Sequence, residues 1–308
     1  MLASAPSIAR FTPPTENELR RALRARPQQK LDIGHSRVAA WTFGPDAAEG
    51  VLDVLFIHGW PLDAATFRRI VPHLASTFRC HLIDLPGVGQ SESDASAPVD
   101  LVSHAASVRT AVDRLGLERY AVLAHDSGGF VARLLAAEDP RVAGLVLADT
   151  EIPGFMSPLL AGLVLASRLP RADLLLRAML GSRMIRRSAL GFGGCFEDPD
   201  YIDSEFFGLF VEPLLRDERV LRRQLRVLQT LSREFDARLT AAHERIRVPV
   251  QLLWGTDDPF FPIAKARAMV STFKGPVEFE SLRGAKLFPH EDRPEQFAGF
   301  ARGFLERV

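Results

Sequence analysis

The stretch Ala124-His125-Asp126-Ser127-Gly128-Gly129 decides the fold, because it joins a short apolar run to a helical pattern. The apolar run, 120–124, predicts a buried strand, so the chain must turn sharply into the helix that follows. Such a turn has room only for small residues two positions before and two after its central residue. Ala124 and Gly128 meet this requirement around Asp126, whereas a turn centred on Ser127 would place bulky His125 at a small position. The pattern predicts an exposed, reactive Asp126; the alternative is an aspartate that only caps the helix.

The pattern outward from this turn alternates between strand and helix. Strands are expected at 31–33, 38–43, 51–57, 80–85, 120–124 and 144–148, and helices at 66–77, 101–115 and 127–138. The alternation resumes with strands at 248–254 and 276–282 and helices at 263–273 and 294–307. This order predicts a mostly parallel sheet with helices on both faces.

Between the two alternating parts, residues 153–245 show mainly helical periodicity and few strand signals. We therefore expect one α/β core built from 31–152 and 246–308, with 153–245 as an inserted helical subdomain. Residues 1–30 contain no apolar signal-peptide run and are predicted to form an exposed N-terminal arm.

Composition narrows the classes of function. The 308 residues include 38 Lys and Arg and 38 Asp and Glu, so the net charge is zero and no basic surface for nucleic acid is expected. The cysteines, Cys80 and Cys195, are too few for a disulfide framework and lack zinc-site spacing. We expect a soluble, cytoplasmic protein without a membrane or nucleic-acid partner and without a metal; the oligomeric state stays open.

Three motifs in order resemble the signatures of the α/β-hydrolase fold. They are His58-Gly59-Trp60-Pro61, Asp84-Leu85-Pro86-Gly87-Val88-Gly89-Gln90-Ser91 and His125-Asp126-Ser127-Gly128-Gly129. The aspartate in the third motif is similar to the branch of haloalkane dehalogenases and epoxide hydrolases, and the 153–245 insertion resembles the helical cap of these enzymes. The resemblance implies that Asp126 attacks carbon to form an ester, which histidine-activated water then hydrolyses without an organic cofactor.

The same resemblance implies the neighbours of Asp126. The backbone N–H groups of Trp60 and Ser127 correspond to the oxyanion hole, and the Trp60 indole either serves a leaving group or belongs to the core. The acid that orients the catalytic histidine corresponds to Asp258, with Asp149 as the alternative position.

The catalytic histidine itself departs from the family pattern. Counting back from Pro294 places Leu287 at the histidine position and Lys286 at the glycine before it. Either the loop is re-routed so that His290 reaches Asp126, or the base is absent. The predicted function is accordingly a hydrolase-like enzyme acting on a small or medium apolar substrate. The alternative is a lyase, cyclase or isomerase that uses Asp126 as acid or base, with Lys286 as a speculative neighbour, or a catalytically inactive ligand-binding protein.

The inserted segment lacks the polar groups by which the family activates its substrates. The only tyrosines are Tyr120 and Tyr201, so a pair of tyrosines over an epoxide is not expected, and no tryptophan lies in 153–245. Phenylalanines and methionines are frequent there instead. They predict either an apolar roof over the pocket or the segment's own core.

Overall fold

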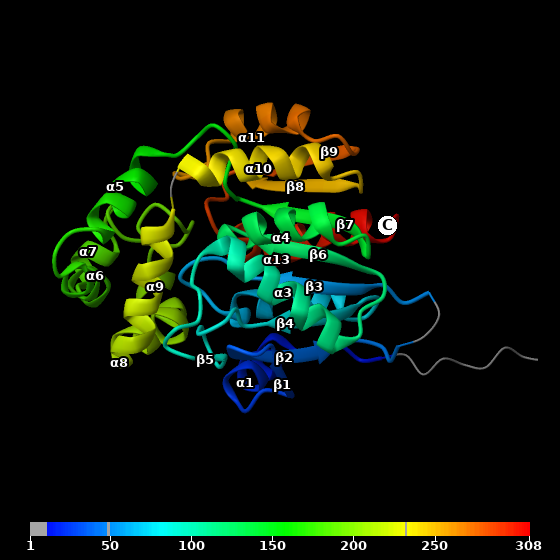
Figure 1. The fold of residues 1–308 in the computed structure, drawn as a ribbon, viewed down its shortest axis with the longest axis horizontal. Helices are drawn as coiled ribbons and strands as arrows, with labels where there is room; N and C mark the ends of the chain where they lie inside the picture. The colour runs from blue at the N-terminus through cyan, green and yellow to red at the C-terminus, as the bar shows by residue number, and fades with distance from the viewer. Residues whose placement is uncertain (1–10, 48–49, 232) are drawn as a thin grey trace, which may run out of the picture.

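The computed structural model describes residues 11–47, 50–231 and 233–308, and only the backbone of 233–236. Its centre is a single twisted sheet in the order β1-β2-β4-β3-β6-β7-β8-β9, with β5 paired to β2 (Figure 1). The strands are β1 (Gln29–Asp32), β2 (Ser36–Phe43), β3 (Asp53–Ile57), β4 (Arg79–Ile83), β5 (Glu92–Ser93), β6 (Tyr120–His125), β7 (Val142–Ala148), β8 (Val250–Gly255) and β9 (Val277–Leu282). From β4 to β9 all pairs are parallel, whereas the pairs made by β2 are antiparallel. The predicted mostly parallel sheet is confirmed.

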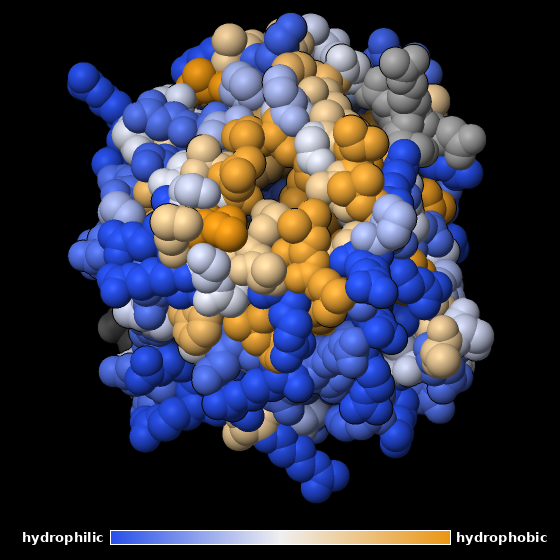
Figure 2. Space-filling view, turned by 90° about the vertical axis from the view of Figure 1, so that its left-hand side faces the viewer, coloured by the Kyte–Doolittle hydropathy of each residue, from blue (hydrophilic) through white to orange (hydrophobic). Residues whose placement is uncertain are grey.

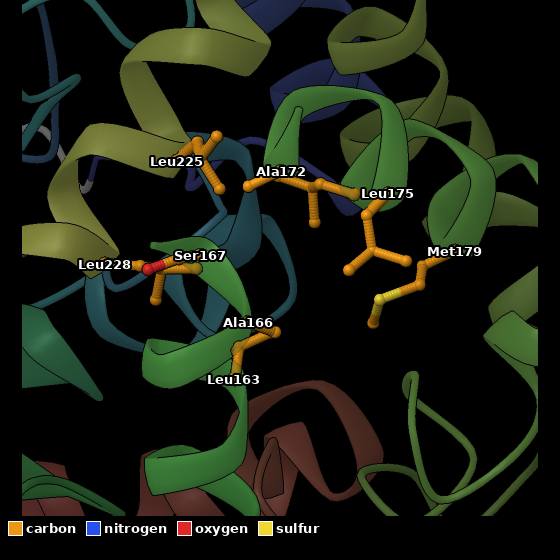
Figure 3. Close-up of a pocket in the computed structure, with 9 residues that line it drawn as sticks. Leu163, Ala166, Ser167, Ala172, Leu175, Met179, Leu225 and Leu228 are labelled. Carbon is orange, nitrogen blue, oxygen red and sulfur yellow. The ribbon is translucent and has the colours of Figure 1, made fainter. Parts of the chain in front are cut away.

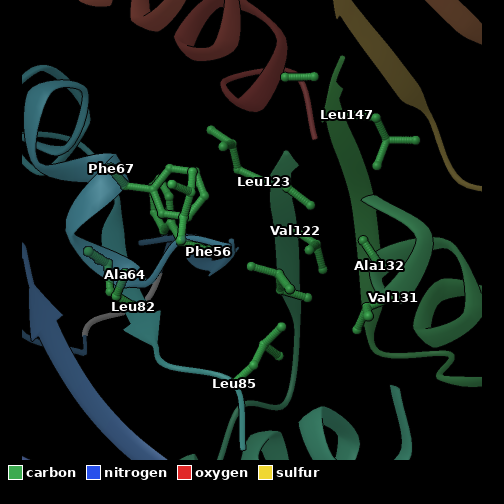
Figure 4. Packing of buried hydrophobic residues seen from close by; sticks show 14 of the residues in the cluster. Phe56, Ala64, Phe67, Leu82, Leu85, Val122, Leu123, Val131, Ala132 and Leu147 are labelled. Atoms are coloured by element: carbon green, nitrogen blue, oxygen red, sulfur yellow. The ribbon is translucent and has the colours of Figure 1, made fainter. Parts of the chain in front are cut away.

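The central strands are buried along almost their whole length. Every residue of β6 and of β8 is buried, which is the pattern of parallel strands covered on both faces. Side chains from β3, β4, β6, β7 and α4 meet in the core, among them Phe56, Leu82 and Leu123 (Figure 4). The apolar runs form central strands because both faces of each strand carry apolar side chains, which are stable only when they are buried.

The helices begin and end where local capping allows. Asp100 caps α3 by accepting a hydrogen bond from the Ser103 backbone, and Gly116 ends that helix at a φ of 69°. The core helices are α1 (Glu16–Arg24), α2 (Val71–Leu74), α3 (Leu101–Leu115), α4 (Ser127–Glu138), α10 (Arg233–Arg245), α11 (Ile263–Met269), α12 (Pro289–Asp292) and α13 (Pro294–Leu305). Two 3-10 helices belong to the core, η1 (Ala64–Arg69) and η4 (Val270–Thr272). A third, η2 (Tyr201–Asp203), lies in the inserted segment. Helix α4 packs against α3 and α10, whereas α13 packs against α2, so the sheet carries two separate helix groups.

The remaining helices form a layer beside the carboxyl ends of the parallel strands, at the left of Figure 1. They are α5 (Pro158–Ser167), α6 (Ala172–Gly181), α7 (Arg183–Arg186), η3 (Phe207–Val211, one π-helical turn), α8 (Glu212–Arg216) and α9 (Glu218–Thr230). We call them the α5–α9 layer. Helix α10 lies beside α4 and not in this layer. The inserted segment was expected to run to residue 245, but its last helix joins the core.

The N-terminal arm contains a helix that the sequence reading missed. Thr15 and Glu18 form a reciprocal capping box at the start of α1, and Leu19 and Leu23 are buried where α1 packs on η1. Two leucines four residues apart are too short an apolar pattern to stand out among the surrounding charged residues. Residues 1–10 of the predicted arm lie outside the described residues.

No helix among the described residues is both long and apolar enough to cross a bilayer.

Candidate active site

Asp126 lies on the tight turn between β6 and α4. Its φ of 50° and ψ of −134° are unusual for a residue other than glycine and cost on the order of 1–3 kcal/mol. The turn approaches the end of β3 so closely that two glycines are required. A Cβ on Gly59 would lie 2.4 Å from Asp126 Oδ2, and a Cβ on Gly128 would lie 2.3 Å from the Ile57 carbonyl oxygen. The small residue at 128 is thus needed as expected, and the glycine at 59 serves the same turn.

Trp60 and Ser127 both donate to the Asp126 carboxylate. The Trp60 N–H donates to Asp126 Oδ2 at 2.8 Å, and the Ser127 hydroxyl donates to the same oxygen at 3.3 Å. The structure thereby brings together the two residues that the sequence assigned to an oxyanion hole. The Trp60 indole was expected either to serve a leaving group or to belong to the core. Its Nε1–H donates to the Gln224 carbonyl oxygen of α9 at 3.0 Å. The indole N–H is therefore already engaged and does not point to a leaving group.

The carboxylate faces a cavity of about 510 Å³ between the sheet and the α5–α9 layer. Most of its wall is aliphatic or aromatic, and besides Asp126 the polar or charged lining side chains are Ser127, Glu151 and Arg186, whose guanidinium is paired with Asp203. The apolar lining residues include Trp60, Leu159, Leu160, Leu163, Leu175, Leu176, Met179, Leu180, Leu190, Phe192, Leu228, Phe260, Phe261, Leu287 and Phe288. Such a site binds an apolar molecule and offers it one polar end.

Three helices of the α5–α9 layer close one side of this cavity. Figure 3 shows a small crevice between α5, α6 and α9, where Leu163, Leu175 and Leu228 point toward one another. These three side chains also line the main cavity. The phenylalanines of the inserted segment have both of the expected roles, as pocket roof and as core. Phe192 lines the cavity, whereas Phe196 and Phe206 pack edge to face with each other.

Glu151 is the functional candidate that the sequence reading missed. It follows the end of β7, the strand next to β6, and therefore lies at the same edge of the sheet as Asp126. Its Oε2 accepts a hydrogen bond from Thr150 Oγ1 at 2.7 Å and lies 3.4 Å from Nη2 of the buried Arg133. Both contacts fix the position of the carboxylate at this edge of the sheet. The sequence could have indicated Glu151, because it is an acidic residue that follows the predicted strand 144–148 by three positions.

Burial and, to a smaller extent, the nearby Glu151 charge raise the pKa of Asp126 to about 8, against the lowering effect of the hydrogen bonds from Trp60 and Ser127. At neutral pH the protonated acid predominates, and the nucleophilic carboxylate becomes the major form only above about pH 8.

Asp149 and Asp258, the two alternative acids, lie together behind the cavity. Asp149 Oδ1 accepts the Gly255 N–H at 3.0 Å, and Asp258 Oδ1 accepts the Phe260 N–H at 2.7 Å. Burial raises the pKa of both groups, that of Asp258 to about 6, and the charge of Asp258 raises that of Asp149 further. The Oδ2 atom of each is buried and accepts no hydrogen bond from an N–H or hydroxyl group of the described residues, while the two carboxyl groups interact with each other. The geometry does not select one acid over the other.

Leu287 lines the cavity with Asp126, at the position where the family pattern has histidine. The structure does not bring His290 to Asp126: its Nε2 lies 2.7 Å from Thr66 Oγ1, and the side chain is fully buried. His125, next to Asp126, also points away and donates through Nε2 to the Leu287 carbonyl oxygen at 2.7 Å. All eight histidines belong to the described part of the chain, and none of them lines the cavity. Lys286 does not line it either.

Comparison with known proteins identifies the architecture. A family model described as alpha/beta hydrolase fold matches residues 54–173. A pimeloyl-[acyl-carrier protein] methyl ester esterase of Yersinia pseudotuberculosis is 26% identical over 267 residues, 84% of this chain and 95% of that protein. Among solved structures, the haloalkane dehalogenase DbeA of Bradyrhizobium elkani has a TM-score of 0.75 at 22% identity and covers 90% of this chain and 96% of its own. The epoxide hydrolase CorEH has a TM-score of 0.74 at 22% identity, with 90% and 97% covered.

Proposed function

Because the chain has the α/β-hydrolase fold, we propose that it is an enzyme of the hydrolase type whose reactive group is the Asp126 carboxylate, acting on a small or medium apolar molecule in the cavity beneath a cap formed by the α5–α9 layer. The observation that carries this proposal is the convergence of the Trp60 N–H and the Ser127 hydroxyl on Oδ2 of that carboxylate, which faces the cavity. A carboxylate that acted only as a helix cap would need no such pair. The similar proteins named as an esterase, a dehalogenase and an epoxide hydrolase support the same class of chemistry.

In the first step, the Asp126 oxygen that faces the cavity attacks an electrophilic carbon of the substrate. A C–O bond forms while the bond to the leaving group breaks, and the leaving group departs with the electron pair. Oδ2 stays against the Trp60 N–H and becomes the carbonyl oxygen of the new ester. The described lining offers no tyrosine or free indole N–H to the leaving group, so substrates with a good leaving group are favoured.

In the second step, we assign to Glu151 the proton transfer that an imidazole performs in relatives. Water attacks Cγ of Asp126 and loses its proton to the Glu151 carboxylate, while the negative charge that develops on Oδ2 is held by the Trp60 N–H and the Ser127 hydroxyl. Collapse of this intermediate expels the alkoxide, which takes the proton back from Glu151. The carboxylate of Glu151 suits this role because it lines the same cavity and its charge is supported by Arg133.

A second candidate function rests on Leu287. Without an imidazole, a protonated Asp126 is a proton donor, and the site would then catalyse a lyase, cyclase or isomerase reaction of an apolar molecule, or only bind one. The raised pKa of Asp126, about 8, favours this candidate at neutral pH.

Intact-mass analysis together with product assays distinguishes the candidates. The native chain is incubated with an alkyl halide, an epoxide and an activated ester, and Asp126→Asn is the matched control. The hydrolase proposal expects a covalent adduct or product that Asp126→Asn abolishes. In Glu151→Gln the adduct should still form but should persist, with turnover lower by about 10²–10⁴-fold, the usual contribution of a general base. Absence of both adduct and product from the native chain, with proton exchange or isomerisation of an apolar ligand that depends on Asp126, would support the second candidate instead.

A further inference from the structure

The α5–α9 layer carries an unusual group of exposed apolar side chains. Apart from Phe11, every large hydrophobic residue that is strongly exposed in the described chain lies between positions 156 and 190. These residues are Met156, Leu165, Leu169, Leu174, Leu175, Met184 and Leu190, and we call them the apolar rim. Met184 is 80% exposed, Leu190 73% and Leu165 67%, values that leave nearly whole side chains in water.

The apolar rim surrounds the entrance of the cavity. Leu175 and Leu190 are exposed and also line the cavity, so the rim and the interior are continuous. Figure 2 shows this face of the molecule, with hydrophobic residues gathered around a hollow and polar residues farther out. Contiguous apolar patches of this kind mark interaction sites, because monomeric proteins rarely leave them in water.

The charge of the same segment is strongly one-sided. Residues 153–192 contain six arginines and one acidic residue, Asp173, although the whole chain is neutral. Arg183, Arg186 and Arg187 all form ion pairs with Asp203, and Arg187 also pairs with Asp200. Arg168, Arg171 and Arg177 are exposed, and none has a carboxylate partner within the described ranges. Arg168 and Arg177 bond only backbone carbonyl oxygens of the neighbouring helices. Three free positive charges therefore stand among the leucines of α5 and α6.

We propose that the apolar rim docks on an anionic lipid surface and that apolar molecules enter the cavity directly from that surface. Protruding leucine and methionine side chains can enter the boundary between headgroups and acyl chains, while the three arginines stay at the level of the anionic headgroups. The chain binds the surface without crossing it. This inference goes beyond the reaction at Asp126 and does not rest on it. A partner of this kind was not expected from the sequence, because the rim is assembled only when α5, α6 and α7 fold around the entrance.

Flotation of the full chain with lipid vesicles tests the proposal. Binding is expected to phosphatidylcholine vesicles that contain phosphatidylglycerol, to be weak with phosphatidylcholine alone, and to fall as salt concentration rises. Replacing the three arginines by glutamine (Arg168→Gln, Arg171→Gln, Arg177→Gln) should lower the partition coefficient on the order of a hundredfold, because each cation contributes about fivefold near an anionic surface. The matched triple Arg→Lys variant keeps the charge but not the guanidinium hydrogen bonds, and it should retain binding.

A second pair of variants separates apolar insertion from charge alone. Leu165→Ser with Met184→Ser removes two rim side chains that do not line the cavity, and it should weaken binding to the anionic vesicles. Arg109→Gln with Arg114→Gln changes two exposed arginines on α3, outside the α5–α9 layer, and should leave binding unchanged. Failure of the native chain to float with either vesicle overturns the proposal. Equal binding to both vesicle types, loss of binding in the Arg→Lys variant, or a stable dimer in light scattering that disappears with the rim variants would each overturn it as well.

Discussion

At the scale of single residues, Leu287 determines how the site can complete a reaction. Two buried carboxyl oxygens, Asp149 Oδ2 and Asp258 Oδ2, accept no hydrogen bond from an N–H or hydroxyl group of the described structure, and both residues stand at positions where the family pattern has the acid that orients the histidine. We therefore expect Lys286→Gly with Leu287→His to restore a general base oriented by an acid. Hydrolysis of a reactive alkyl halide, epoxide or ester should rise by up to about 10²–10⁴-fold in a steady-state product assay.

The control for this gain is His290→Ala in the native background. His290 is held by Thr66 away from the cavity, so turnover should change little. The stability of this variant has to be checked by thermal unfolding, because the side chain is fully buried. Multiple turnovers by the native chain that vanish in a folded His290→Ala variant would contradict the placement of His290 outside the reaction.

The pH dependence of adduct formation belongs to the same scale. Attack requires the Asp126 carboxylate, and burial with the Glu151 charge holds the pKa of Asp126 at about 8. The rate of adduct formation should therefore increase about tenfold per pH unit below pH 8 and level off above it. Glu151→Gln removes one of the raising charges and should move the midpoint to lower pH. A native midpoint near the ordinary aspartate value would refute this assignment, and rapid-quench mass analysis across the pH range measures it.

At the scale of elements, helix α1 stabilises the fold through two buried leucines although most of its residues are charged or polar. Leu19 and Leu23 are buried against η1, so Leu19→Ala and Leu23→Ala should each lower the free energy of unfolding by about 2–5 kcal/mol. Arg21→Ala on the exposed side of the same helix should stay within about 0.5 kcal/mol of the native value. Urea unfolding of the three variants provides the measurement, and equal effects of the leucine and arginine changes would contradict the packing role.

The elements of the core could be predicted because their signals are local. β6 and α4 appear in the sequence as an apolar run and a helical pattern, and the turn between them follows from two small residues around Asp126. The place of Leu287 followed from its spacing to Pro294. Glu151 and α1 could not be recognised in this way, since the first depends on which strand lies beside β6 and the second on a surface supplied by η1. The position of α10 beside α4 likewise depends on tertiary contacts and not on its helical pattern.

At the scale of the whole molecule, a buried ion pair within the core also binds a tyrosine of the inserted segment, and so connects that segment to the core. Arg68 of η1 lies 2.9 Å from both carboxylate oxygens of Glu291 in α12, and the Tyr201 hydroxyl of the inserted segment donates to Glu291 Oε2 at 2.9 Å. Because Arg68 and Glu291 are almost fully buried, Glu291→Gln removes the carboxylate that bonds Arg68 Nη1 and leaves Glu205, at the other side of the guanidinium, as its remaining close charge partner. It should destabilise the fold by about 3–5 kcal/mol.

The double variant Arg68→Met with Glu291→Leu is the corresponding control. Removing both charges together avoids a guanidinium without its Glu291 partner, so the double variant should be more stable than Glu291→Gln in thermal unfolding. A double variant that unfolds at a lower temperature than the single one would show that the charges matter through the other groups around Arg68, such as Glu205 and Tyr201.

The acid pair at Asp149 and Asp258 also bears on the history of the chain. Two ionisable groups kept in the interior without an imidazole to orient are costly to retain, yet both positions still carry carboxyl groups. A single substitution, Leu287→His, is the short path that would return an imidazole to this position. The pair keeps that path open, because a newly acquired histidine would meet an acceptor already in place. Under selection for faster ester hydrolysis, this site is therefore where an evolving population should change first.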